Sequence, residues 1–537
     1  MKRAMLLLAL SFTVLLTLSM LGACTKSANA PSSQPASAVA GGVKNPDIFV
    51  IASDSEPTLL DPHIAYDPMS SDAIVQAYEG LVTFKDDTSD IIPLLATSWE
   101  VSGEGQIWTL KLRENVKFSD GTPFDAEAVK INFDRILDIN QGPAWMFDMI
   151  TKTEAVDKST VRFTLEYPYA SFLYALASGA GALMISPKAI KDHEVNGDWG
   201  MAWLRDHMVG TGPYVLDRWV IGQGWSMSKN PDYWQGWSGK HASRIELRVV
   251  KESASRMLML QNGDADFAGN ITRDTLGQLT GNPDVVVLQK PSINVLNICL
   301  NNQRGALKDK RVRQAMAYAF SYDDAVFGIY TGRASYQIGP MAGGVWSFNP
   351  NLVRYQTNLD TAKKLLAEAG YPNGGGLTFT CQTETGADDY AKVVELFQAD
   401  MKKIGITINI QVLSWATIED MLETAESAAD MFITGVYPDF PDPDNALYQQ
   451  FHSSGIGNIN QSFYINPEVD RLLDIARRTI NDEQRLQTYH RVQQLINEDS
   501  PCVFVLVRDM IETYRTWVKD YIYNPFLSRQ YYYMYKE

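Results

Sequence analysis

Apolar and polar residues follow regular patterns between residues 377 and 436, and these patterns predict strands and helices in turn. Period-two alternation indicates a half-buried strand, whereas apolar residues spaced by three and four positions indicate a helix with one buried face. The predicted elements are, in order, a strand that includes residues 377–381, a helix over 388–404, a strand over 406–412, a helix over 416–427 and a strand over 431–436. Gly405 stands where a helix C-cap belongs. This βαβαβ order implies an α/β fold with parallel strands and right-handed crossovers.

The ends of these three strands predict where a ligand binds, because ligands of open α/β sheets bind beyond the carboxyl ends of the strands. The first strand ends near Glu384, and the second ends at Trp415. The third leads into the loop 437–445, whose sequence is YPDFPDPDN. We therefore expect two carboxylates and three aromatic side chains of these segments to meet on one rim.

The loop 437–445 combines a stiff backbone with candidate ligand contacts. Its three prolines fix φ at several positions and so lower the entropy that is lost when a ligand is ordered against it. Its candidate ligand-binding side chains are Tyr437, Asp439 and Phe440. Asp444 stands just ahead of an expected helix, so the favoured interpretation of Asp444 is an N-cap. Asp439 lies too far upstream to cap that helix.

The N-terminal residues have the pattern of an export signal. Lys2 and Arg3 precede an apolar run over residues 5–21, and the sequence LGAC ends at Cys24. This order of positive, apolar and small residues predicts a secretory signal peptide over residues 1–23. The stretch resembles a bacterial lipobox, in which the cysteine is acylated, so Cys24 is the predicted lipidation site. An ordinary cleaved leader and a retained membrane span are the alternatives.

The residues after the expected signal lack the apolar content of a core. Residues 24–44 are rich in Ser, Ala, Pro and Gly, and we expect them to form a flexible tether. No later apolar stretch approaches the roughly 18 residues that a membrane span needs. The remaining chain is therefore expected to be a soluble, extracytoplasmic body.

Composition limits the classes of partner and of chemistry. The chain has 537 residues, 45% of them hydrophobic, which is enough for several domain-sized cores and excludes a disordered protein. Lys and Arg total 47 against 63 Asp and Glu, and the resulting net charge of -16 argues against nucleic-acid binding. The four cysteines form neither a CxxC pair nor a disulfide framework.

A search for catalytic motifs gives no indication of an enzyme. The sequence has no GxSxG, HExxH or GxxxxGK[ST] motif. Its six histidines are isolated from one another, whereas metal sites usually place two ligands within a few residues. We therefore expect no catalytic residues, no metal site and no cofactor.

Several segments spread along the chain have distinctive sequences. The most distinctive is FSDGTPF at residues 118–124. The others are EPTLLDPH from Glu56, VGTGPY ending at Tyr214, RMLMLQNGDADF at 256–267, KDKRVRQAMAYAF at 308–320 and DTAKKLLAEAGYPNG at 360–374. Together, and in this order through nearly all of the mature chain, they resemble the family 5 solute-binding proteins of ABC importers, the group that binds peptides, dipeptides and nickel. The resemblance implies a periplasmic-binding-protein fold of two lobes, with an extra subdomain inserted in lobe one.

The resemblance also implies where the lobes begin and end. Lobe one is expected to combine residues 45–90, 208–296 and 508–537, with the inserted subdomain over 91–207, and lobe two is expected over 297–507. The chain then crosses between the lobes near residues 296 and 507. Two crossings form a hinge, which a ligand closes when it contacts both lobes.

Ligand contacts follow from the same resemblance. In peptide-binding relatives an aspartate of the loop that matches 437–445 accepts the ligand's α-ammonium, and Asp439 occupies that place. Dipeptide-binding relatives hold the ligand's carboxylate with an arginine where this chain has Glu384, which argues against dipeptide binding by that route. A longer peptide or a cationic ligand is expected to suit both carboxylates better. Trp346 and Trp415 complete the predicted ligand-binding set.

The expected function is capture of an oligopeptide or another amine-bearing solute by lobe closure, followed by delivery to an ABC permease whose ATPase subunits supply the energy. The protein is expected to be a monomer, attached to the membrane by its lipid. An oligosaccharide-binding protein of the same family is the alternative, because aromatic side chains also stack on sugar rings. Nickel binding ranks third. A secreted hydrolase that uses Asp439 and Asp442 is disfavoured, because two acids of one loop do not bracket a scissile bond.

Overall fold

The computed structural model describes residues 42–537, with the side chains of residues 273 and 274 excepted. The expected signal peptide over residues 1–23, the lipidation site Cys24 and residues 24–41 of the expected tether lie outside the described residues and stay predictions. In the described part of the chain, no helix has the length and the apolar character that crossing a membrane requires.

The main sheet of the described chain has eleven strands in the order β15-β14-β16-β12-β17-β11-β1-β10-β9-β8, with β13 paired to β17. Its strands are β1 (Ile48–Ser53), β8 (Tyr214–Val220), β9 (Gly224–Lys229), β10 (Arg244–Val249), β11 (Phe267–Ala268), β12 (Val285–Leu300), β13 (Ala334–Tyr336), β14 (Thr378–Glu384), β15 (Thr407–Leu413), β16 (Met431–Val436) and β17 (Cys502–Arg515). The N-terminal strand β1 lies between β10 and β11 and is parallel to both.

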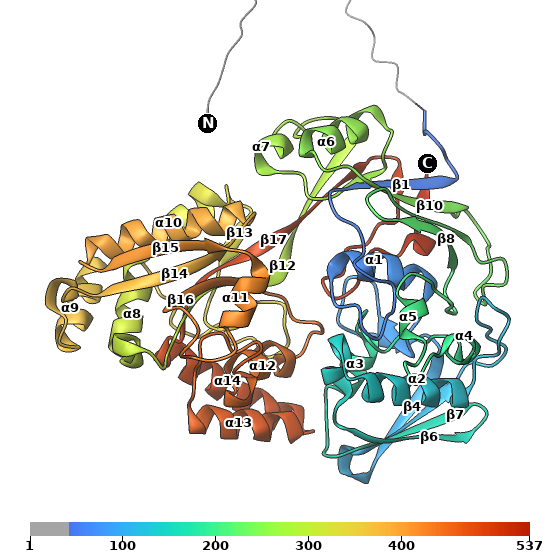
Figure 1. The fold of residues 1–537 in the computed structure, drawn as a ribbon, viewed down its shortest axis with the longest axis horizontal. Helices are drawn as coiled ribbons and strands as arrows, with labels where there is room; N and C mark the ends of the chain where they lie inside the picture. The colour runs from blue at the N-terminus through green and yellow to red at the C-terminus, as the bar shows by residue number, and fades with distance from the viewer. Residues whose placement is uncertain (1–41) are drawn as a thin grey trace, which may run out of the picture. The chain divides into compact units, whose positions relative to one another are not determined.

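The helices are distributed over the whole of the described chain. They are α1 (Pro68–Ala77), α2 (Ala126–Ile139), α3 (Phe172–Ala177), α4 (Pro187–His193), α5 (Met201–Leu204), α6 (Ser253–Asn262), α7 (Arg273–Leu276), α8 (Lys310–Ala319), α9 (Leu359–Glu368), α10 (Asp388–Lys403), α11 (Trp415–Met421), α12 (Gln449–Phe451), α13 (Pro467–Arg478) and α14 (Asp482–Asp499). In Figure 1, α8, α9 and α10 lie around β14 and β15.

The predicted βαβαβ unit is confirmed. β14 pairs in parallel with β15 and with β16, and α10 and α11 form the crossovers between these strands. The second helix ends at Met421, earlier than predicted. The hydroxyl of Ser427 donates a hydrogen bond of 2.9 Å to the Met421 carbonyl and so occupies an acceptor that a longer helix would use.

The strands β12 and β17 connect the two halves of the sheet. They pair antiparallel along their length, and one end of the pair adjoins β16 while the other adjoins β11 (Figure 1). The register shifts between Pro291 and Val295 and again directly after Leu296. Such irregularities interrupt the hydrogen-bond ladder and bend a strand. The domain boundaries and the hinge drawn from the sequence stay predictions.

A separate four-stranded antiparallel sheet lies between residues 96 and 165. Its strands are β4 (Ala96–Ser102), β5 (Ile107–Leu112), β6 (Ile150–Asp157) and β7 (Thr160–Leu165), in the order β4-β5-β7-β6. The helix α2 packs against this sheet (Figure 1). The ring centre of Phe133 on α2 lies 4.8 Å from that of Phe163 on β7.

The largest core joins segments that are far apart in the sequence. Phe163 and Phe172 belong to it, and so do Phe440 and Leu447 from the segment that follows β16. All four side chains are fully buried. The loop 437–445 is therefore anchored by apolar contacts, which hold the polar residues between its prolines in place.

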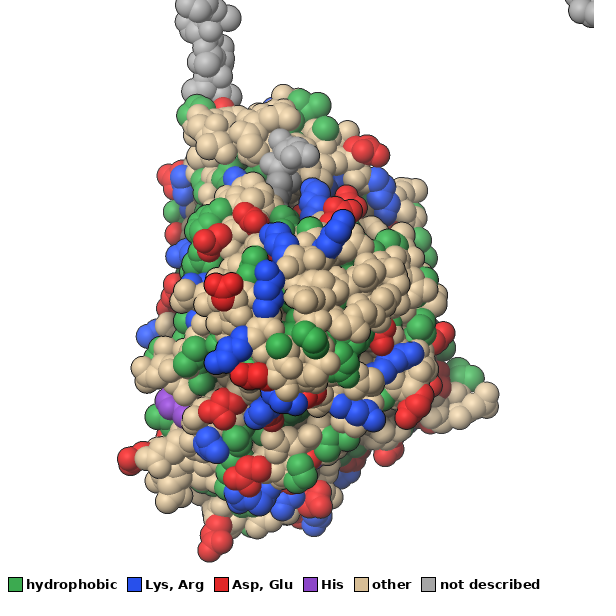
Figure 2. All heavy atoms as spheres, turned by 90° about the vertical axis from the view of Figure 1, so that its left-hand side faces the viewer, with side chains coloured by type: hydrophobic (Ala, Val, Ile, Leu, Met, Phe, Trp, Pro, Cys, Tyr) green, Lys and Arg blue, Asp and Glu red, His purple; other side chains and the backbone are tan. Residues whose placement is uncertain are grey.

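Charged side chains are mixed on the surface. On the face shown in Figure 2, basic and acidic residues are interspersed. This face therefore has no continuous basic surface of the kind that nucleic acids bind, in agreement with the net charge of -16.

Candidate functional site

Asp439 lies at a junction between distant parts of the chain. The hydroxyl of Tyr66 donates a hydrogen bond of 2.8 Å to Asp439 Oδ2, and the amide of Asn445 donates one of 3.3 Å to the same oxygen. The backbone N–H of Asp439 donates to Asn445 Oδ1 over 2.7 Å, and its carbonyl accepts from the Ser178 hydroxyl over 3.3 Å. The Asn445 contacts fix the loop, and the Tyr66 contact brings the segment before α1 to it.

Neutral groups alone contact the Asp439 carboxylate. Among the described residues, no Lys, Arg or His forms an ion pair with it. Burial raises the pKa of Asp439, and the hydrogen bonds from Tyr66 and Asn445 offset that rise only in part. A cation that entered this place would stabilise the ionised carboxylate and lower its pKa again.

The other two aspartates of the loop are paired with arginines. Both terminal nitrogens of Arg485 donate to the Asp442 carboxylate over 2.7 Å, and both side chains are almost completely buried. Arg477 Nε donates to Asp444 over 2.9 Å, and the Tyr169 hydroxyl donates to the same carboxylate over 2.9 Å. These carboxylates are therefore structural ties between the loop, the helices α13 and α14, and the segment before α3.

The interpretation of Asp444 as an N-cap is wrong. The helical segment after the loop begins with a π-helical turn at Asp444 itself, so this residue lies inside the turn. Its carboxylate is drawn to Arg477, while Asp442 Oδ1 accepts from the Asp444 backbone N–H over 2.9 Å. The side chain that accepts a backbone N–H at the start of this helical segment is therefore that of Asp442, two residues before Asp444.

The predicted aromatic contacts occupy two different environments. Trp415 is the first residue of α11 and is 41% exposed, and Tyr437 is 46% exposed with its hydroxyl donating to the Pro525 carbonyl. Phe440 is fully buried and packs in the core. Trp346 is half-buried, and its ring centre lies 5.2 Å from the guanidinium of Arg485, the residue that pairs with Asp442. Trp415 and Tyr437 are therefore accessible at the surface, whereas Phe440 packs in the core beneath the loop, and contact of any of them with a ligand stays a prediction.

Glu384 is the last residue of β14 and is half-buried. It lies close enough to Tyr390 to add to the increase in the pKa of that phenol, which burial causes in the first place. Its place at the carboxyl end of the strand is as predicted, and its contact with a ligand stays a prediction.

Arg508 was not predicted from the sequence. It is on β17, and its guanidinium lies 5.4 Å from the centre of the Tyr390 ring. A Cβ atom placed on Gly435 would come within 3.1 Å of Arg508 Nη2 and 3.3 Å of Asn294 Oδ1, so the guanidinium reaches the end of β16. Among the described residues no carboxylate pairs with Arg508. The Asn294 oxygen is buried and has no hydrogen-bond partner in the described structure.

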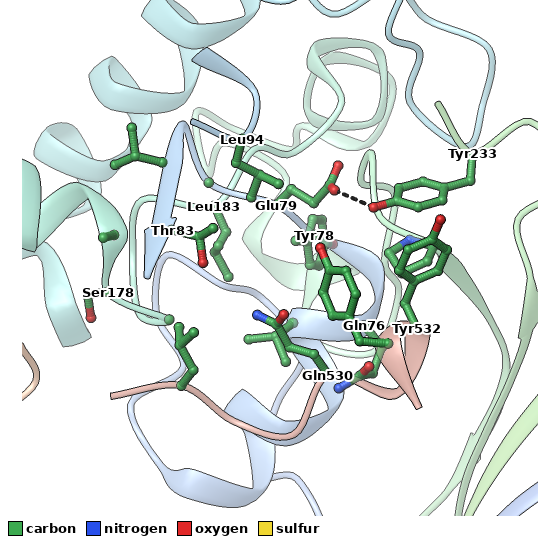
Figure 3. Close-up of a pocket in the computed structure, with 18 residues that line it drawn as sticks. Gln76, Tyr78, Glu79, Thr83, Leu94, Ser178, Leu183, Tyr233, Gln530 and Tyr532 are labelled. Atoms are coloured by element: carbon green, nitrogen blue, oxygen red, sulfur yellow. Dashed lines mark hydrogen bonds between the residues drawn. The ribbon is translucent and has the colours of Figure 1, made fainter. Parts of the chain in front are cut away.

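Figure 3 shows a small pocket with a volume of about 60 Å³. Glu79 lines it and accepts hydrogen bonds of 2.8 Å from Thr211, Tyr233 and Trp234. Burial raises the pKa of Glu79 to about 7. Ser178 also lines the pocket, and its bond to the Asp439 carbonyl connects the two places. No sequence pattern marks Glu79, because its partners lie more than a hundred positions away.

Potential metal ligands are not gathered in the described residues. Within them, no three side chains of His, Cys, Asp or Glu lie together in a group that would hold a metal ion.

Comparison with known proteins gives consistent results. Residues 90–458 match the family model of the bacterial extracellular solute-binding proteins, family 5 Middle. The probable D,D-dipeptide-binding periplasmic protein DdpA of Escherichia coli (strain K12) is 32% identical over 488 residues, which are 90% of this chain and 93% of that protein. Heme-binding protein A of Haemophilus influenzae is 30% identical, with 94% of this chain and 95% of that protein covered.

A solved structure shares the fold. The ABC transporter-associated periplasmic binding protein DppA from Helicobacter pylori, in complex with the peptide STSA, matches with a TM-score of 0.80 and 28% identity. The match covers 91% of this chain and 98% of that one. The two-lobe α/β binding-protein fold expected from the sequence is thereby confirmed.

Proposed function

The chain belongs to family 5 of the bacterial extracellular solute-binding proteins, and we propose that it captures a short peptide, or another solute with a free amine, for an ABC importer. One observation carries this proposal. The loop 437–445 contains three aspartates, and Asp439 alone among them has no arginine partner in the described structure. A carboxylate that is partly withdrawn from water and has no cation beside it is costly, so a charge supplied by the ligand would stabilise it.

Asp439 is proposed to accept the ligand's ammonium group. The Tyr66 hydroxyl donates a hydrogen bond to Oδ2, and the loop backbone is held by Asn445, so the carboxylate loses little conformational entropy when a ligand binds. Trp415 and Tyr437, both partly exposed, would pack against the ligand's side chains.

Arg508 is proposed to hold the ligand's carboxylate. Among the described residues its guanidinium has no carboxylate partner, and it lies at Gly435, four residues before Asp439 in the sequence. Four residues of chain span at most about 14 Å, a distance that suits an extended peptide of about two to four residues. Arg508 would thus take the role that the resemblance assigns to an arginine at the position of Glu384.

Capture is proposed to proceed by hinge closure. Because β12 and β17 shift register between the two halves of the sheet, these strands can bend there while both halves stay folded. A ligand that bridges Asp439 and its neighbours would favour the closed form, which would then dock on the permease. The ATPase subunits of the importer would supply the energy.

The alternatives have less support. Asp442 is held by two hydrogen bonds from Arg485 in a buried pair, so it lacks the freedom of a catalytic acid or base, which disfavours the hydrolase. The oligosaccharide alternative is not favoured, since the relatives above are described as binding a dipeptide, heme and a peptide. Attachment to the membrane through an acylated Cys24, and a monomeric state, remain proposals of their own.

The amine assignment can be tested with the ligand that the protein retains. Native mass spectrometry of the purified protein identifies a retained peptide, and titration calorimetry then compares that peptide with its N-acetylated form. We expect acetylation to weaken binding by about 30-fold or more, because it removes the charge that Asp439 is proposed to hold. Equal affinity of both forms would rule out the amine assignment.

A further inference from the structure

Two of the cysteines face each other across the strands that connect the halves of the sheet. Cys299 of β12 and Cys502 of β17 are direct partners in the antiparallel register. Their sulfur atoms are 3.3 Å apart, and both side chains are buried. Although the two residues are separated by 203 positions, the strand pairing brings them into contact.

The backbone geometry at this pair suits a disulfide. The next pair in the register is Leu300 and Pro501, whose N–H and carbonyl are joined by a hydrogen bond of 3.1 Å. Hydrogen-bonded and non-hydrogen-bonded pairs alternate along antiparallel strands, so Cys299 and Cys502 form a non-hydrogen-bonded pair. In such pairs the Cα atoms are about 4.5 Å apart, and disulfides form with Cα atoms about 4.4–6.8 Å apart.

We propose that Cys299 and Cys502 form a disulfide in the exported protein. The cell compartment favours this, since disulfides form and persist outside the cytoplasm and the relative DdpA is a periplasmic protein. The inference needs export of the chain, but it does not depend on which ligand the protein binds.

The oxidant is a disulfide of the thiol oxidoreductase or oxidised glutathione class. The thiolate of one cysteine attacks this disulfide, which gives a mixed disulfide and releases one thiol of the oxidant. The second cysteine then attacks the mixed disulfide, which forms the bond between the two Sγ atoms and releases the second oxidant thiol. The two protein thiols lose two protons and two electrons, and the oxidant gains both.

The bond is expected to form while the chain folds. Burial and the neighbouring Cys299 thiol raise the pKa of Cys502 in the folded protein, so the reactive thiolate is scarce once β12 and β17 have paired. The folded sheet then protects the disulfide from reductants. The bond fixes the pair beyond the register shifts and leaves residues 291–297 free to bend.

Cys381 provides a matched control. It is fully buried on β14, which is separated from β12 by β16. Neighbouring strands lie about 4.8 Å apart, so this cysteine is too far from Cys299 for a disulfide, which cannot join Cα atoms more than about 7 Å apart.

The test uses the wild-type protein recovered after export. Its thiols are alkylated in denaturant without reduction, and proteolytic peptides are analysed by mass spectrometry before and after reduction. We expect a cross-linked peptide that contains Cys299 and Cys502, two hydrogen masses lighter than the sum of its parts, and an alkylated Cys381. Alkylation of both Cys299 and Cys502, or a bond from either to Cys381, would overturn the proposal.

A second measurement checks the consequence of the bond. Reduction of the unfolded protein and refolding without oxidant should lower Tm by roughly 3–6 °C relative to refolding with oxidised glutathione. The variant Cys299→Ala should lose this difference, whereas Cys381→Ala should keep it. A difference that persists in Cys299→Ala would assign the effect to another group and contradict the proposal.

Discussion

The carboxylates at the two ends of the loop 437–445 have different hydrogen-bond and ion-pair partners. At one end Asp442 and Asp444 are neutralised by Arg485 and Arg477, which α14 and α13 supply. At the other end the side-chain carboxylate of Asp439 accepts hydrogen bonds only from Tyr66 and Asn445 in the described structure. One short segment can therefore hold both structural ties and a binding group. The presence or absence of an arginine partner distinguishes the two kinds of carboxylate.

The neutralised end gives the loop its fixed position. Arg485 also donates to the Ser171 hydroxyl over 2.8 Å, and Tyr169 donates to Asp444, so the arginines and aspartates connect the loop to the segment before α3. The position of Asp439 depends on these contacts of the neutralised end, because the hydrogen bonds to Asp439 itself do not neutralise its charge. Substitutions at the two ends of the loop should therefore affect stability and binding separately.

The substitution Asp442→Ala should destabilise the fold most. It leaves the buried Arg485 guanidinium without its anion, a loss that costs about 3–5 kcal/mol of unfolding free energy in buried pairs. Urea denaturation at neutral pH measures the change, and Asp420→Ala on the exposed side of α11 is the control, with an expected effect near zero. A loss below about 1 kcal/mol would mean that this end of the loop is not a structural tie.

Glu79 tests whether a buried carboxylate can stay ionised without an ion pair, because its hydrogen-bond donors are neutral and only the charge of Arg113 also favours its ionised form. Its pKa is about 7 in the folded protein and 4.5 ordinarily, so the unfolded chain releases this proton at lower pH than the folded protein does. Stability should therefore fall as pH rises from about 4.5 to 7, by up to about 3 kcal/mol. The variant Glu79→Gln cannot ionise and should lose this part of the pH dependence.

Urea denaturation of both proteins at several pH values measures the two slopes. Equal slopes would show that three neutral donors and the charge of Arg113 suffice to stabilise the buried Glu79 carboxylate without an ion pair. Asp439 would then not need a cation from the ligand on these physical grounds.

The substitution Asp439→Asn should separate binding from stability. We expect it to weaken a retained amine-bearing peptide by about 30-fold, or about 2 kcal/mol, because the ammonium loses its counter-charge. The unfolding free energy should change by less than about 0.5 kcal/mol or should rise, since burial of the ionised group opposes folding. Calorimetric titration and urea denaturation measure the two quantities, and the opposite pattern would make Asp439 a structural residue.

The substitution Arg508→Gln should have the smallest effect of the four. It should weaken a peptide with a free C-terminus by about tenfold, or about 1.4 kcal/mol, and leave the C-terminally amidated peptide unchanged. Titration of both peptides against both proteins measures the coupling. An equal loss for the two peptides would show that Arg508 does not contact the carboxylate.

The sequence anticipated the local part of this site well. The alternation between residues 377 and 436 predicted the three strands, their parallel order and the strand ends at which Glu384 and the loop stand. It did not anticipate Arg508, which is more than a hundred residues from Glu384 in the chain. The sequence also led to the wrong interpretation of Asp444 as a helix N-cap, because Arg477 reaches that carboxylate only in the folded protein.

Hydrophobic periodicity and turn residues act over a few positions, so local patterns were enough to predict the α/β class, the βαβαβ unit and a proline-rich, acidic loop after a buried strand. Which aspartate of that loop is neutralised became visible in the folded chain, which places Tyr66 against Asp439 across 373 positions. It also brought Cys299 and Cys502 into register. The reason is physical: charge balance and strand pairing depend on which groups share a place, and distant segments meet only when the core forms.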